Sequence, residues 1–267
     1  MYTSSSLFGI IMLSTVLFAT VHKLSCTAET IFIKTNSSDH QCPAESCLTL
    51  PEFMSYSRVE SNTVVKFLPG KHILAFSINK SIALLDVVNI TLTGVSDQQS
   101  SVIHCVSEFS IIAINVQNLT ISKLSFLGCG APLPEEELHV HDSGVPKSAT
   151  LYLLHVLNGK ILDTHVYDSS GVGMLILNGY DLILNRTSLT GNRPNCAFIF
   201  MNESNSPVKL HTFIYIANSD FTDGISGSSF YGGGLSLSFL QASHTVYMSI
   251  NEVALYNNIG ISYGNFS

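Results

Sequence analysis

The chain has 267 residues, of which 46% are apolar and only 12% are charged, against about 25% charged in an average soluble protein. Its formal net charge is -7, and it contains three arginines and no tryptophan. This balance argues against a nucleic-acid partner, because binding to phosphates requires a basic surface.

The N-terminus predicts a secretory signal peptide. Residues 7–21 form an almost unbroken apolar run, which is shorter than the roughly 20 residues that span a bilayer. The small residues Cys26-Thr27-Ala28 follow, so we expect residues 1–28 to be removed by cleavage after Ala28. The alternative is an uncleaved anchor, since Met1–Ser6 has no Lys or Arg. The predicted location is therefore secreted and extracellular.

Acceptor sequons for N-glycosylation agree with secretion. Two of them, at Asn89 and Asn118, directly precede predicted strands, where a glycan has room. The full set of predicted glycosylation sites is Asn36, Asn79, Asn89, Asn118, Asn185, Asn202 and Asn265.

Residues 29–61 differ from the rest of the chain. Cys42 and Cys47 flank a four-residue loop, and residues 48–54 predict a short amphipathic helix with Pro51 in its first turn. After this segment, residues 63–68 and 72–76 predict two strands joined by a Pro-Gly turn.

A short pattern recurs from residue 90 onward. Apolar or small residues stand at offsets 0, 2, 5 and 7, and a turn-forming residue stands at offset 9. The clearest copies begin at Leu119, Leu182, Ile214 and Met248, and a weaker copy begins at Gly159. Offsets 0 and 2 indicate one face of a strand, and the step to offset 5 indicates a bend followed by another strand. A further apolar strand precedes each copy, at 112–116, 149–153, 173–177, 197–201 and 235–239. Such repeats with unequal intervals predict a solenoid with variable corner loops.

The repeat over residues 62–267 resembles the right-handed parallel β-helix of the pectin-lyase-like superfamily, especially secreted animal proteins that carry this repeat. The segment Phe67–Leu74 resembles the opening coil of that family. The resemblance implies an all-β, right-handed parallel β-helix. Because an open solenoid exposes its core at its ends, residues 29–61 are then predicted to form a small N-terminal cap. A disordered mature N-terminus is the alternative.

The enzymes of that superfamily include pectate lyases and polygalacturonases. The polygalacturonase-like signatures Asn-Thr-Asp, Asp-Asp, Gly-His-Gly and Arg-Ile-Lys are absent, and a Trp-x-Asp-His signature is excluded by the lack of tryptophan. Weak candidates for a catalytic carboxylate are Asp163, Asp168 and Asp181, because paired-acid hydrolysis needs two carboxylates about 5–9.5 Å apart. Asp168 stands at a turn offset, where a structural role is sufficient.

The longest polar insertion covers residues 130–148. It contains Glu136, His139, His141 and Asp142, which are weak candidates for a Ca²⁺ or Zn²⁺ site. The usual interpretation of such a charged, Pro-rich loop is that it is simply solvated, so we predict no metal and no other cofactor.

Five cysteines follow the predicted cleavage site. We expect disulfides between Cys42 and Cys47, and between Cys105 and Cys129 if neighbouring coils bring the latter pair together. Two buried thiols are the alternative for Cys105 and Cys129. Cys196 is left over. It is expected to be buried ahead of Ala197–Phe200, and the alternative is that it pairs with a part of the protein outside this sequence.

These observations predict a non-catalytic extracellular scaffold, adhesion surface or glycan-binding surface whose partners are extracellular glycans or proteins. One alternative is a polysaccharide-active lyase or glycosidase of the same fold. Another is the ectodomain of a membrane receptor whose spanning segment lies beyond Ser267, because the pattern stops at residues 257–267 without a C-terminal cap. We expect the β-helix at 62–267 to be truncated at its C-terminal end, and the alternative is that this end is left uncovered.

Overall fold

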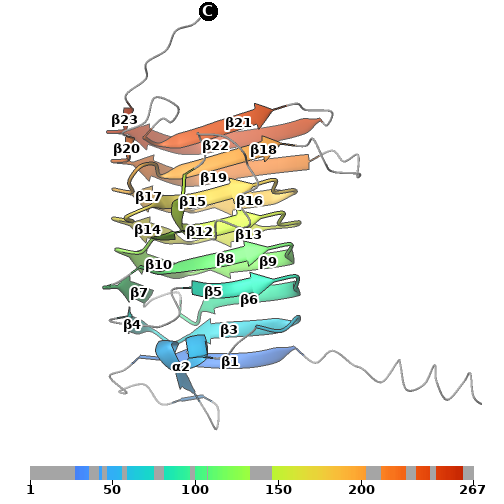
Figure 1. Ribbon diagram of the computed structural model, residues 1–267, viewed down its shortest axis with the longest axis vertical. Helices are drawn as coiled ribbons and strands as arrows, with labels where there is room; N and C mark the ends of the chain where they lie inside the picture. Colours follow the sequence, from blue (N-terminus) through green and yellow to red (C-terminus); the bar gives the residue numbers. More distant parts are fainter. Residues whose placement is uncertain are drawn as a thin grey trace, which may run out of the picture.

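The computed structural model describes residues 28–35, 42–43, 47–55, 59–74, 81–96, 100–106, 108–132, 146–202, 212–226, 233–240 and 245–260. These residues form a right-handed parallel β-helix, in which successive coils stack along one axis (Figure 1). Each coil contributes strands to three faces, and the strands of one face pair in parallel with the coils before and after. In the described residues, no helix has the length and apolar character needed to cross a bilayer.

The first and second faces belong to one 14-stranded sheet, and the third face belongs to a 7-stranded sheet. The first face contains β1 (Glu29–Lys34), β3 (Thr63–Phe67), β6 (Val88–Gly94), β9 (Gln117–Ser122), β13 (Lys160–Leu162) and β16 (Leu182–Asn185). The second contains β4 (Gly70–Leu74), β7 (Ser101–Cys105), β10 (Leu124–Leu127), β14 (His165–Tyr167) and β17 (Ser188–Thr190). Two longer strands, β19 (Thr212–Thr222) and β22 (Val246–Tyr256), run across both faces. The third face contains β5 (Ser81–Leu85), β8 (Ser110–Ile114), β12 (Ser148–Leu154), β15 (Val172–Leu177), β18 (Ala197–Asn202) and β21 (Leu235–Leu240).

The repeat found in the sequence supplies the core. Leu119 and Ile121 of β9, and Leu124 and Phe126 of β10, are fully buried inside the coil. Their counterparts Leu184 and Leu189 are equally buried. Offsets 0 and 2 therefore line the first face and offsets 5 and 7 line the second, which confirms the predicted strand, bend and strand.

Left-handed backbone conformations turn the chain at its corners. The offset-9 residues all have positive φ, from 50° at Asp168 to 67° at Gly128 and Gly191. Asp, Asn and Gly tolerate this region best, which explains why turn formers occupy offset 9. The bend between the first and second faces has a left-handed residue as well, including Lys123 (φ 55°) and Arg186 (φ 52°).

The N-terminal end contains the short helix α2 (Leu50–Ser55), which lies next to β1 at the blue end of the solenoid (Figure 1). Leu50, Phe53 and Met54 are buried in the core there. Thr49 caps the helix: the Glu52 N–H donates to Thr49 Oγ1, and the Thr49 N–H donates to Glu52 Oε2 at 2.6 Å, which is a capping box. Strand β2 (Leu48–Thr49) pairs with β1.

The parallel sheet begins earlier than the sequence predicted. Strand β1 pairs in parallel with β3 and buries Ile33, so the segment at 29–34 is part of the first face. The alternation of Ile31 and Ile33 is too short to identify as a coil without its neighbour. The other short strands are β11 (Ala131–Pro132), antiparallel to β12, and the pair β20 (Ile225–Ser226) and β23 (Ile259–Gly260).

A buried histidine gives the fold a predicted pH dependence. His72 of β4 is 1% exposed, and its Nε2 lies 2.8 Å from the carbonyl oxygen of Leu68. Burial lowers its pKa below the ordinary value, and this effect outweighs the hydrogen bond. In the unfolded chain the His72 imidazole takes up a proton near pH 6.5, whereas in the folded chain it takes up a proton only at a lower pH. The stability that depends on neutral His72 is therefore complete above about pH 6.5 and declines as the pH falls below that value.

Urea unfolding at pH 7.5 and pH 5.0 tests this expectation. The wild type should lose stability at the lower pH, and His72→Phe should lose less, since it has no proton to gain. His155 and His165 also have lowered pKa values, so a residual slope is expected in the variant. An equal pH slope in the two proteins would contradict the assignment to His72.

Candidate functional site

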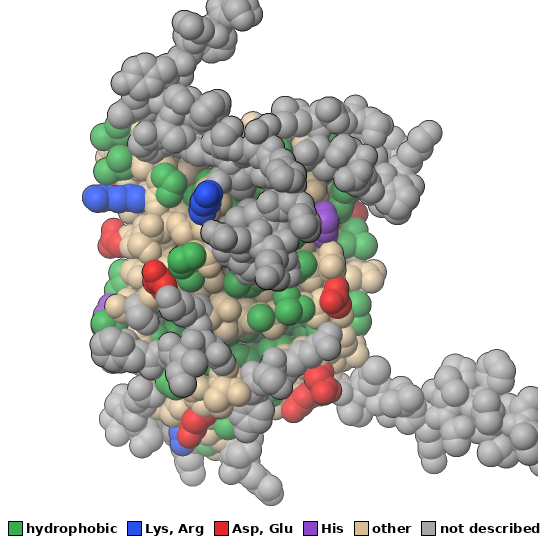
Figure 2. All heavy atoms as spheres, in the orientation of Figure 1, with side chains coloured by type: hydrophobic (Ala, Val, Ile, Leu, Met, Phe, Trp, Pro, Cys, Tyr) green, Lys and Arg blue, Asp and Glu red, His purple; other side chains and the backbone are tan. Residues whose placement is uncertain are grey.

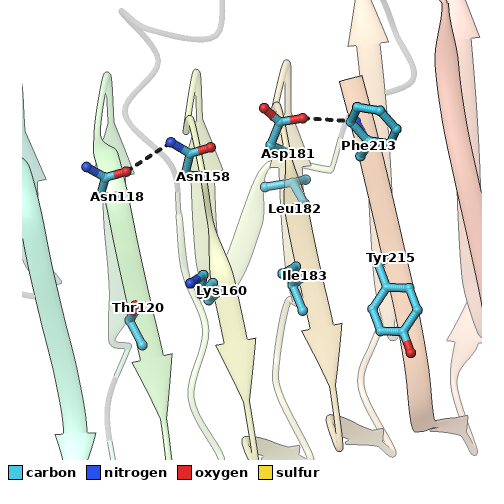
Figure 3. Close-up of a pocket in the computed structure, with 9 residues that line it drawn as sticks. All are labelled: Asn118, Thr120, Asn158, Lys160, Asp181, Leu182, Ile183, Phe213 and Tyr215. Carbon is cyan, nitrogen blue, oxygen red and sulfur yellow. Dashed lines mark hydrogen bonds between the residues drawn. The ribbon is translucent and has the colours of Figure 1, made fainter. Parts of the chain in front are cut away.

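A groove of about 600 Å³ lies on the outer surface of the first face (Figure 3). Its walls come from four neighbouring strands, β9, β13, β16 and β19, and from the residues that directly precede β13 and β16. The lining residues are Asn118, Thr120, Asn158, Lys160, Asp181, Leu182, Ile183, Phe213 and Tyr215.

Strand register sets the side chains of the groove in rows. Because side chains alternate across a strand, the neighbours of the buried offset-0 residues point outward. Thr120, Lys160, Ile183 and Tyr215 are register partners and form one outward row. The pairings also align Asn118, Asn158, Asp181 and Phe213 in a second row, which Tyr247 of β22 continues. We call this second row the groove row.

Hydrogen bonds hold the first part of the groove row in place. Asn158 Nδ2 donates to Asn118 Oδ1 at 2.9 Å (Figure 3). Asn118 Nδ2 in turn donates to Asn89 Oδ1 at 2.8 Å. The amide stack continues to Asn62, which accepts a 2.8 Å bond from Asn89. All four asparagines have positive φ, so the same backbone turn repeats in each coil. The polar groups are thus fixed relative to one another before any ligand binds.

The row changes its chemistry at Asp181. The Oδ1 atom of Asp181 accepts a 3.1 Å hydrogen bond from the Phe213 N–H. After Asp181, the next members of the row are the aromatic rings of Phe213 and Tyr247. The rings of Phe213 and Tyr247 stack 5.1 Å apart at an interplanar angle of 15°. Phe213, Tyr215 and Tyr247 are 56%, 38% and 49% exposed, which is unusual for large apolar side chains that sit together.

This arrangement is suited to binding a carbohydrate. Aromatic faces offer flat apolar surface to the C–H faces of sugar rings, while amides, Lys160 and Asp181 offer donors and acceptors to hydroxyl groups. Lys160 is exposed in the same groove. Because the groove is open and its side chains come from regular strands, it presents a pre-formed surface.

The structure does not bring the three candidate aspartates together. Asp181 lies in the groove, Asp163 lies at the bend after β13, and Asp168 lies at the corner after β14 with φ 50°. Asp163 is five positions beyond Asn158, the register partner of Asp181, so the two carboxyl groups are on the order of 15 Å apart. That separation exceeds the limit for paired-acid hydrolysis, about 9.5 Å.

Asp163 has an ion-pair partner of its own. Arg186 donates to it through Nε and through Nη2, the latter at 2.9 Å from Oδ2. The hydrogen bonds and positive charge of Arg186 lower the pKa of this carboxyl group. Asp163 therefore stays ionised, as a member of the column of corner residues that also contains Lys123 and Asn218.

The candidate metal ligands Glu136, His139, His141 and Asp142 lie outside the described residues. Within the described part of the chain, no group of three or more His, Cys, Asp or Glu side chains is placed to hold a metal ion. Charged side chains are scattered singly over the surface drawn in Figure 2 rather than gathered into a patch.

The outer side of the third face is apolar. Ile112, Tyr152, Leu175 and Phe198 are register partners, and they point away from the coil interior. They belong to a second hydrophobic cluster whose members are at most 8% exposed. These described side chains are therefore packed rather than open to solvent. The sequence analysis did not predict this cluster.

Both expected disulfides are present. Cys42 pairs with Cys47, and Cys105 pairs with Cys129 at a Cα–Cα distance of 5.0 Å. Cys196 is a buried free thiol, and burial raises its pKa to about 11, so it stays protonated and unreactive.

The sequons occupy different environments. Asn89 and Asn118 are exposed on the first face, and Asn185 is partly exposed, with its Oδ1 accepting a 3.0 Å bond from Asn218. Asn202 ends β18, and Asn36, Asn79 and Asn265 lie outside the described residues. Their glycosylation stays a prediction.

Comparisons with known proteins give neighbours in structure. No protein-family model and no curated protein sequence matches the chain. Among solved structures, a rhamnogalacturonan lyase is similar over 86% of this chain and 56% of its own, with 12% identity and a TM-score of 0.40. The pectate lyase Bsp165PelA from Bacillus sp. N165, solved in complex with trigalacturonate, is similar over 90% of this chain and 87% of its own, with 12% identity and a TM-score of 0.31. The assignment of the fold rests on the strand pairing of this chain, and these neighbours say nothing about its activity.

Proposed function

We propose that the protein is a secreted and non-catalytic β-helix that binds extracellular glycans through the groove on its first face, and that it is glycosylated at sequons other than Asn118, whose side chain lines that groove. The observation that carries the proposal is the exposed aromatic group of Phe213, Tyr215 and Tyr247 beside fixed polar side chains. Secretion is supported by the two disulfides, which persist in oxidising compartments, and by the apolar N-terminal run. Strand β1 begins at Glu29, directly after the expected cleavage site, so cleavage leaves the first face intact.

The acidic content of the groove supports binding rather than hydrolysis. Among the described residues that line the groove, Asp181 is the one acidic residue, and one of its oxygens is engaged by the Phe213 N–H. A glycosidase needs an acid and a base or nucleophile on opposite sides of the bond.

Removal of the aromatic rings should weaken glycan binding. We expect Phe213→Ala and Tyr247→Ala each to reduce affinity roughly tenfold, the cost of losing a central aromatic contact of about 1.4 kcal/mol. Binding of the purified protein to a glycan array, followed by calorimetry on the best ligand, measures the effect. Tyr256→Ala is the matched control, because Tyr256 is 55% exposed but lies on the second face. Equal losses in all three variants, or no loss in any, would contradict the assignment.

A polysaccharide lyase is the second candidate, and Lys160 is the observation that favours it. Lys160 and Asp181 lie in neighbouring coils of the groove, and β-elimination from a uronate needs a cation at the substrate carboxylate and a base for the α-proton. Incubation with a polysaccharide panel and Ca²⁺ separates the two functions. Unsaturated products that disappear in Asp181→Asn would establish the lyase, whereas unchanged polymer that is still bound would support the binding protein.

A further inference from the structure

We infer that the groove takes an extended, uncharged, β-linked polysaccharide that lies along the solenoid axis and places one sugar on each coil. This inference rests on the proposed glycan-binding function and specifies the class of ligand. It depends on three properties of the groove: its direction, its spacing and its charge.

The direction follows from the groove row. Asn158, Asp181, Phe213 and Tyr247 each come from a different coil, and strand register places them one after another along the axis. A ligand that touches the amide, the carboxylate and both rings must therefore cross the strands rather than follow one of them. A ligand lying along a single strand would meet only one member of the row.

The spacing is set by the backbone. Neighbouring parallel strands lie about 4.8 Å apart, so the groove row repeats at that distance. Pyranose rings joined in an extended β-1,4 chain advance by nearly the same distance per ring. Each ring of such a chain meets equivalent positions on successive coils, whereas an α-1,4-linked glucan curves and leaves this register. The 5.1 Å separation of the Phe213 and Tyr247 rings agrees with this repeat.

The charge of the groove favours an uncharged chain. Of the lining residues that the structure describes, Lys160 and Asp181 are the two charged ones, and they have opposite sign. A polyuronate places one carboxylate on every sugar, and a groove with one cation and one anion compensates few of them. Hydroxyl groups, in contrast, find both donors and acceptors in Asn118, Asn158 and Asp181.

The length of the groove row predicts the length of the ligand. The row runs through the groove lining from Asn118 of β9 to Phe213 of β19 and continues by register to Tyr247 of β22, so it includes one residue from each of five coils. About five sugars therefore fill the row at one sugar per coil. Affinity should rise with each added sugar up to about that length and then level off.

Calorimetric titration of the intact protein with oligosaccharides of two to eight sugars tests the inference. The probes are β-1,4-linked glucose and N-acetylglucosamine oligomers, α-1,4-linked glucose oligomers and oligogalacturonates. We expect β-linked pentamers to bind at least tenfold more tightly than dimers, with little gain beyond about six sugars, and to bind at least tenfold more tightly than the α-linked and acidic oligomers of equal length.

The Tyr247→Ala variant supplies an internal check. Loss of the last position of the groove row should lower the affinity of pentamers roughly tenfold, and the affinity should stop rising with ligand length about one sugar earlier. Tyr256→Ala should leave both quantities unchanged.

Three other results would overturn the inference. If a β-linked disaccharide binds as tightly as a hexamer, or if α-linked or acidic oligomers bind best, the axial, uncharged ligand is wrong while the glycan-binding function stands. If no saccharide on the array or in these titrations binds, the proposed function fails together with the inference.

Discussion

Replacement of Leu184 by aspartate is expected to unfold the protein. Leu184 is fully buried on the inner side of the first face, between register partners Ile161 and Ile216 of the neighbouring coils. The introduced carboxylate would have no partner in this apolar stack, and the cost of burying it exceeds about 4 kcal/mol, a large part of the total stability of a typical domain. Circular dichroism and urea unfolding measure the loss directly.

The preceding residue provides the matched control. Ile183 points to the opposite side of the same strand, where it lines the groove. Ile183→Asp keeps its charge in water and should cost about 1 kcal/mol, which reflects the poor fit of aspartate to a strand. If both variants fold equally well, Leu184 is not a core residue and the assignment of the inner side is wrong.

Loss of the Cys105–Cys129 disulfide should have the next largest effect. The bond joins the ends of neighbouring strands across a sequence separation of 24 residues, and both cysteines are buried. Closing a loop of this length restricts the unfolded chain by about 3 kcal/mol in the loop-entropy model. We therefore expect the double variant Cys105→Ala, Cys129→Ala to lose about that much free energy of unfolding under oxidising conditions.

Cys196→Ala serves as the control for this experiment. It also removes a buried sulfur atom, but from a free thiol, so only the packing contribution of about 1 kcal/mol is lost. An equal loss in the single and the double variant would show that the disulfide contributes no more than ordinary packing.

Much of the fold could be predicted because its inner positions follow a short, fixed pattern. Leu119, Ile121, Leu124 and Phe126 are buried where the offsets 0, 2, 5 and 7 place them. The pattern survives unequal coil lengths because the longer connections fall between strands rather than within them, as between β10 and β12 and between β18 and β19. The inward-facing positions of the strands therefore keep their spacing.

The bend between the first and second faces was harder to predict. It uses a left-handed residue in each coil, and Lys123, Arg186 and Glu252 are not residues that favour this conformation. Their side chains lie at an exposed corner, where Arg186 pairs with Asp163. Sequence composition carries no signal for such a bend, and only the repeat register shows it.

The groove was missed for a different reason. Its residues are adjacent only across coils, and their separations in the sequence are unequal. A signal did exist at the position just before each repeat copy, where Asn118, Asn158, Asp181, Phe213 and Tyr247 stand. Comparison of this outward position between copies would have shown amides giving way to aromatic rings. Asp163, Asp168 and Asp181 were considered as a catalytic group because they are close in the sequence. In the structure they lie at three different corners of the coil.

The axial stacking of the coils can be measured most directly as distances between spin labels on the first face. Val64, Ile183 and Ser249 lie in the same outward row. Ile183 is four strand spacings from Val64, and Ser249 is six strand spacings from Val64. Double electron–electron resonance on Val64→Cys/Ile183→Cys and Val64→Cys/Ser249→Cys should give mean distances of about 19 Å and 29 Å, each with a narrow distribution. Equal distances in the two pairs, or a shorter distance for the pair that is further apart in the sequence, would contradict a parallel β-helix.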